Sequence, residues 1–276
     1  MGRSISIDPL GFRNFTMGSD SIKCTYDNSK ADQAGEKVSP KNIYANPLDP
    51  FLCTFTALGV WFSLQKKVLV NHEAFFLGFG KIGSAGSRYC TQLADLLKGF
   101  TDEVRNYARP ERTRSHGTRK GSAMYATSGT TAPLPLPSVA ARGEWSQGAI
   151  FDVYFQFAEP GDQYLGQCLA GLDPNSPSFA ILPPHFTVST IQEDVANAMR
   201  ISFGDFGERY NKTGMLLFCL ASMVHNIEFL REYAAKSPAH PFNKLPLLQH
   251  PELVDRLWLL PSPATDSHNQ PGFHRM

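Results

Sequence analysis

The sequence predicts an α+β fold that is mostly helical and carries a small antiparallel sheet near the N-terminus. Short β-like runs lie before residue 50, and most later segments carry apolar residues at helical spacing. The 276 residues are enough for one large domain or for a smaller domain with an appendage, and no internal repeat is apparent. We therefore expect one mostly helical domain followed by a helical C-terminal extension.

Two segments near the N-terminus have the pattern of β-strands. SIKCTYDN (21–28) alternates, with Ile22 and Tyr26 on one face, and KNIYAN (41–46) is a second β-like run. The polar segment SKADQAGEKVS between them predicts a connecting loop. We expect these runs to form the small sheet.

The remaining elements are predicted to be helices. Asp49 and Pro50 are placed as the N-cap and first residue of a helix whose apolar residues follow at helical spacing. The apolar run at 215–224 is much shorter than the roughly 20 residues of a membrane span, so it predicts a buried helix. Further helices are expected at about 89–100, at 115–127, from near Pro137, from Ser146 through Tyr154 to about Phe157, at 192–201 and at 211–235, before a Pro-rich polar tail.

The composition is that of an ordinary soluble protein and excludes several classes. The five cysteines form no C-x-x-C pair, so neither a disulfide framework nor a zinc module is indicated. The N-terminus lacks the basic-then-apolar pattern of a secretory signal. We expect a protein of the nucleus or cytoplasm, neither secreted nor membrane-bound.

Basic residues are concentrated in one segment. The formal net charge is only +1, so a nucleic-acid role has to rest on where the basic residues lie. Residues 105–120 contain one acidic residue, Glu111, and six basic residues: Arg105, Arg109, Arg112, Arg114, Arg119 and Lys120. Such a segment is suited to a DNA backbone.

The segment SHGTRKGS contains a His-x-x-Arg pair. His116 and Arg119 are three residues apart, which places both side chains on one face of a helix. Alone this signal is weak, because about 0.4 such matches are expected by chance in a chain with eight histidines. Further along, Trp145 precedes Tyr154 by nine residues, and Tyr154 lies on a predicted short amphipathic helix that starts after Trp145.

The order His-x-x-Arg, Trp, Tyr resembles the signature of the tyrosine recombinases, or phage-integrase family. The likeness is closest to the branch found in eukaryotic mobile elements of the Crypton type. It is carried by the segments NIYANPLDPFLCTFTALGVW, HGTRKGSAMYATSGTT, RGEWSQGAIFDVYFQFAEPGDQYLGQCLAGL and SFAILPPHF. The resemblance covers roughly 1–186, which we expect to be the catalytic domain, with 187–276 as a helical extension ending in the polar tail.

The resemblance implies a set of six catalytic residues. They are Arg3, Lys30 on the hairpin, His116, Arg119, Trp145 and the nucleophile Tyr154. Two guanidinium groups would hold the non-bridging oxygens of a phosphodiester while Tyr154 attacks it. Lys30 would protonate the leaving 5′ oxygen, His116 would accept or relay the tyrosine proton, and Trp145 would donate its indole N–H to the phosphate.

The implied product is a 3′-phosphotyrosyl enzyme with a free 5′ hydroxyl. Because the bond energy is stored, the reaction implies no ATP, metal or other cofactor. The implied partners are double-stranded DNA and further copies of the chain on that DNA. Because recombinases of this type usually carry an N-terminal clamp domain, which we expect to be missing here, the alternative is a catalytically silent DNA-binding or interaction remnant.

Four other interpretations are weaker. GFGKIG (78–83) matches the dinucleotide fingerprint G-x-G-x-x-G, but it follows a predicted helix instead of the first strand of a βαβ unit. His72 and Glu73 lack the second histidine of a zinc-protease helix. Tyr164 is the nearest rival nucleophile, and a type IB topoisomerase uses similar chemistry in a longer chain.

Overall fold

The fold is α+β, mostly helical, with a three-stranded antiparallel sheet near the N-terminus, as predicted. The computed structural model describes residues 10–27, 39–76, 91, 93, 95, 115–129, 133–145, 159–186, 192–210 and 214–258. Contacts divide the chain into two interleaved units. Unit 1 comprises 1–14, 25–41 and 74–165, and unit 2 comprises 15–24, 42–73 and 166–276. This division by compactness differs from the expected segments 1–186 and 187–276, which stay a prediction as functional domains.

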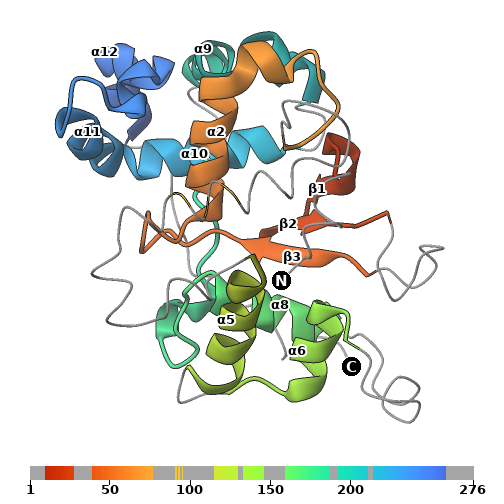
Figure 1. The fold of residues 1–276 in the computed structure, drawn as a ribbon. Coiled ribbons are helices and arrows are strands. Elements are labelled where there is room, and N and C mark those ends of the chain that lie inside the picture. Colours follow the sequence, from red (N-terminus) through yellow and green to blue (C-terminus); the bar gives the residue numbers. More distant parts are fainter. Residues whose placement is uncertain are drawn as a thin grey trace. The chain divides into compact units, whose positions relative to one another are not determined.

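The sheet has the order β1-β2-β3 (Figure 1). Its strands are β1 (Phe15–Met17), β2 (Ser21–Cys24) and β3 (Lys41–Tyr44). β1 and β2 form a tight antiparallel hairpin in which Phe15 lies opposite Cys24. The β-like runs at 21–28 and 41–46 thus form strands, whereas β1 was not predicted, because three residues are too few to show alternation.

Unit 2 is built around a bundle of helices. They are α2 (Thr54–Leu69), α9 (Gln192–Tyr210), α10 (Met215–His225), α11 (Ile227–Ala235) and α12 (Pro251–Trp258). α10 packs on both α2 and α9, and α12 packs on α9 and α10 (Figure 1). The predicted buried helix at 215–224 is confirmed, since most of its side chains are inaccessible to solvent. Burial of this apolar surface stabilises unit 2.

α2 and α10 approach closely at Gly59. A Cβ atom there would lie 2.7 Å from Met223 Sδ and 2.9 Å from the carbonyl oxygen of Cys219. Beside this contact the Thr56 hydroxyl donates to the carbonyl oxygen of Ser222 at 3.3 Å and accepts from Asn226 Nδ2 at 2.9 Å. These buried polar groups are neutral, and they are bonded to one another.

The predicted start of the first helix is wrong. α2 begins at Thr54, with Cys53 at its N-cap. Asp49 instead accepts a hydrogen bond from the backbone N–H of Phe51 at 2.9 Å, in a turn that precedes the helix. An Asp-Pro pair serves a turn as readily as a helix start, because the Asp side chain bonds the backbone two residues on in either case.

The C-terminal part contains more structure than predicted. The helix expected at 192–201 extends to Tyr210, and the one expected at 211–235 is the pair α10 and α11, with Asn226 between them. The polar tail expected after residue 235 is wrong as far as residue 258. There two 3-10 turns, η5 (Pro241–Lys244) and η6 (Pro246–Gln249), and α12 bury Leu245, Leu247, Leu253, Val254 and Leu257. These short elements were not predicted, because the prolines that separate them are typical of loops.

Unit 1 contains α5 (Ser115–Ser128), α6 (Leu136–Gly143) and most of α8 (Glu159–Leu169). The helices expected at 115–127 and near Pro137 are confirmed, and α8 was not predicted. α5 and α6 pack against each other (Figure 1). The helix expected to run from Ser146 to about Phe157 lies outside the described residues.

Candidate functional site

Arg119 on α5 joins α5 to the end of α6. Its side chain is buried, with 8% of the residue exposed. Nη2 donates to the carbonyl oxygen of Gly143, 24 residues along the chain, and Cζ lies 5.0 Å from the ring centroid of Trp145. A planar guanidinium can stack on an indole while its edge donates hydrogen bonds, which a lysine cannot do.

The end of α6 turns Trp145 back over the helix. The backbone N–H of Trp145 donates to Ala140 O at 2.9 Å, and that of Glu144 donates to Ala141 O at 3.1 Å. This is the Schellman pattern of helix termination, and Glu144 takes the left-handed conformation it requires (φ 55°, ψ 42°). Glycine is the usual residue at this position, so Glu144 carries backbone strain.

Gly143 is needed for the contact with Trp145. A Cβ atom at Gly143 would lie 2.9 Å from Trp145 Cδ2, too close for a real side chain. The same glycine presents its carbonyl oxygen to Arg119. The local turn at Gly143 and Glu144 therefore sets the Trp145 indole beside the carbonyl oxygen that accepts from Arg119.

Three further charged side chains are buried around the last turn of α6. Lys41 Nζ donates to Ala141 O at 3.3 Å. Arg142 forms an ion pair with Asp162 of α8, Nη1 to Oδ1 at 2.7 Å, and also donates to the backbone oxygen of Asp162 at 3.2 Å. The side chains of this pair are 8% and 1% exposed.

These groups make the end of α6 a cationic site. Together with Arg119 they are all the buried charged residues in the described part of the chain, and all lie in unit 1. Lys41 and Arg119 bond carbonyl oxygens at a helix C-terminus, where the helix dipole favours positive charge. Ammonium and guanidinium groups beside an indole N–H are the side chains that bind phosphate or carboxylate oxygens.

The structure therefore brings together two of the predicted catalytic residues, Arg119 and Trp145. His116 lies in α5 one turn before Arg119, and Lys120 is exposed on the same helix. The other predicted residues lie outside the described residues and stay predictions: Arg3, Lys30, Arg105, Arg109, Arg112, Arg114 and Tyr154.

Lys41, Arg142 and Asp162 were missed by the sequence reasoning. Lys41 is the first residue of the predicted second strand, and Arg142 lies three residues before Trp145. Both residues therefore lie in segments that the sequence analysis had identified. Nothing in the sequence marks them as buried, since charged residues are normally exposed unless they are paired. Their burial depends on partners up to 100 residues away.

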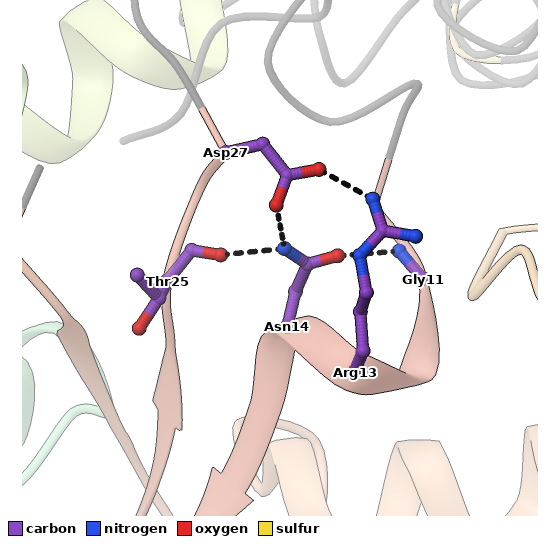
Figure 2. Close-up of polar contacts among 5 residues, drawn as sticks. All are labelled: Gly11, Arg13, Asn14, Thr25 and Asp27. Carbon is purple, nitrogen blue, oxygen red and sulfur yellow. Dashed lines mark hydrogen bonds and ion pairs between the residues drawn. The ribbon is translucent and has the colours of Figure 1, made fainter. Parts of the chain in front are cut away.

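A second polar cluster holds the chain where it leaves β2 (Figure 2). Asn14 is buried; it accepts from Gly11 N–H at 2.8 Å and donates to Thr25 O at 2.9 Å and to Asp27 Oδ1 at 2.7 Å. Arg13 donates to the other Asp27 oxygen at 2.7 Å. The hydrogen bonds from Asn14 and Arg13 hold the pKa of the Asp27 carboxyl below its usual value. The cluster ties the chain at Thr25 and Asp27 to Arg13 and Asn14.

Among the described residues, no group of three or more His, Cys, Asp or Glu side chains is arranged to hold a metal ion. Every helix in the described ranges is too short or too polar to cross a membrane. A scan against protein-family models, a search of curated proteins and a search of solved structures each found no match to this chain.

Proposed function

We propose that this protein is a tyrosine recombinase that cleaves and rejoins DNA strands through Tyr154, in the integration or excision of a mobile element. The observation that carries the proposal is the contact of Arg119 with Trp145. The family signature pairs these two residues, and here they meet from separate elements with the guanidinium over the indole. If Arg119 and Trp145 matched the signature only by chance, there would be no reason to expect their side chains to be in contact.

The buried cations support phosphate chemistry at the same place. Lys41 and Arg119 both bond carbonyl oxygens in the last turn of α6, and Trp145, which lies against Arg119, is 38% exposed. A scissile phosphodiester gains negative charge on its non-bridging oxygens as it is attacked, and preorganised cations stabilise that charge. The partner is double-stranded DNA, met by several copies of the chain in the nucleus or cytoplasm.

The proposed cleavage and rejoining steps need no further reactant. Tyr154 Oη bonds to phosphorus while the bond to the 5′ oxygen breaks, with His116 accepting the phenol proton and Lys30 supplying one to the 5′ oxygen. Arg3 and Arg119 hold the non-bridging oxygens, and Trp145 donates its indole N–H. Attack by a 5′ hydroxyl on the phosphotyrosine reverses these bonds and reseals a strand.

A nicked suicide substrate tests the proposal. Cleavage beside the nick releases a short oligonucleotide, so the enzyme should stay attached and give a protein–DNA adduct that survives denaturation. Tyr154→Phe should abolish the adduct, and Tyr164→Phe is the matched control that should retain it. Folded wild-type protein that binds the DNA without forming an adduct would contradict the proposal and support a silent DNA-binding remnant.

A further inference from the structure

We propose that the buried Arg142–Asp162 ion pair is a positioning pair, which fixes the last turn of α6 and so sets Trp145 against Arg119. The inference rests on the proposed function for its catalytic consequence, which is that the pair controls the rate of strand cleavage without touching DNA. Its structural part concerns the position of Trp145 alone.

The pair ties α6 to α8 at the residue that precedes the site. Arg142 Nη1 reaches both the carboxylate and the backbone oxygen of Asp162, at 2.7 and 3.2 Å. One residue earlier on α8 the helices are in tight contact, since a Cβ atom at Gly161 would lie 2.7 Å from Ser138 Oγ. Because Gly143 follows Arg142 directly, a shift of Arg142 moves the carbonyl oxygen that holds Arg119.

The turn is held at three consecutive residues, each by a charged group. Lys41 bonds the carbonyl oxygen of Ala141, Asp162 holds the side chain of Arg142, and Arg119 bonds the carbonyl oxygen of Gly143. The first and third of these contacts each join a side chain to one backbone carbonyl oxygen of α6. The ion pair differs because Arg142 Nη1 bonds both the carboxylate and the backbone oxygen of Asp162, so it ties the side chain of Arg142 to two atoms of one α8 residue through a charge-assisted bond.

Stability alone does not account for burying these charges. A buried ion pair is often no better than well-packed apolar side chains of similar size, because desolvation offsets the attraction. Replacing both members together should therefore preserve the fold and remove only the bonds between the side chain of Arg142 and Asp162. Arg142→Met with Asp162→Leu is such a replacement.

Fluorescence of Trp145 measures the positioning without DNA. The chain has three tryptophans, so Trp61→Phe with Trp258→Phe leaves Trp145 as the sole emitter. In that background Arg142→Met with Asp162→Leu should shift the Trp145 emission to longer wavelength and raise its acrylamide quenching about twofold, as the indole leaves Gly143 and Arg119. Arg142→Lys keeps the charge and should give an intermediate result; it also serves if the double replacement fails to fold.

Adduct formation on the suicide substrate measures the catalytic consequence. The double replacement should slow it by roughly tenfold to a hundredfold, the cost of misplacing a reacting group by about 1 Å, while DNA affinity stays within about twofold. The matched control is Asp194→Leu with Arg256→Met, which removes the exposed ion pair of unit 2 (2.9 Å) and should change neither readout.

The two readouts separate the two ideas. Unchanged emission and quenching in the folded double variant would overturn the positioning role. A shifted Trp145 with an unchanged cleavage rate would overturn its catalytic consequence. If wild type forms no adduct, the proposed function is wrong. The positioning of Trp145 by Arg142 and Asp162 is then tested by the fluorescence measurement alone.

Discussion

The two units bury different kinds of side chain. Unit 2 is closed by apolar residues of α2, α9 and α10, and in its described part the buried polar residues are all neutral. Unit 1 buries Lys41, Arg119, Arg142 and Asp162 within reach of one helix end. Because charge is expensive to bury, proteins accept it where geometry matters more than stability. Unit 1 therefore holds the candidate site with its buried charges, and unit 2 holds much of the buried apolar surface.

The largest expected effect on stability is in unit 2. Leu220 is fully buried in α10, and Leu220→Ala should lower the free energy of unfolding by about 2–5 kcal/mol through lost burial and a residual cavity. Urea denaturation followed by circular dichroism measures it. Leu217 on the same helix is 36% exposed, so Leu217→Ala should cost less than about 1 kcal/mol. Equal losses in the free energy of unfolding for Leu220→Ala and Leu217→Ala would contradict the difference in burial between the two residues.

A loss of activity of similar size is expected in unit 1. Arg119→Lys keeps the charge but loses the planar contact with Trp145, so adduct formation should fall by roughly 10²–10³-fold, with a much smaller change in DNA affinity. Rates on the suicide substrate and a binding titration measure the two quantities. Arg200→Lys in unit 2 is the control and should match wild type. A wild-type rate for Arg119→Lys would remove Arg119 from the site.

A smaller effect is expected at the strained turn. Glu144 has a positive φ, so Glu144→Gly should raise the free energy of unfolding by up to about 1 kcal/mol. Gly143→Ala, one residue earlier, should instead lower it, because the new Cβ atom meets the Trp145 ring. Thermal unfolding of both variants tests this, and the same sign of change for both would contradict the described turn.

The smallest effect concerns pH. The pKa of Asp27 is lowered in the folded protein, so its stabilisation is present above the unfolded pKa of about 4 and is lost as pH falls through the folded pKa. Because Arg13 and Asp27 are partly exposed, Asp27→Asn should cost less than about 1 kcal/mol at pH 7. Denaturation of both proteins from pH 7 to pH 2 should show the difference shrinking below about pH 4, and a constant difference would exclude the ionised carboxylate as its cause.

The sequence predicted the elements whose pattern is local and long enough to recognise. The helices at 115–127 and 215–224 and the two longer strands all have such patterns. The start of α2 was wrong because Asp49 serves a turn, and α12 was missed because its apolar residues follow two proline-bounded turns. At the site, the spacing of His116 and Arg119 was only a weak signal by itself, and it was the family signature that singled out Arg119 together with Trp145.

What the sequence determined by itself is the fold class, most helix positions and the identity of Arg119 and Trp145 as candidates. Only the tertiary structure decided that the two residues touch, and that Lys41, Arg142 and Asp162 are buried around them. The physical reason is that periodicity records how a segment meets its own core, whereas the burial of a charge depends on a partner from a distant segment. Lys41 and Ala141 are 100 residues apart, and no pattern within either segment records that contact.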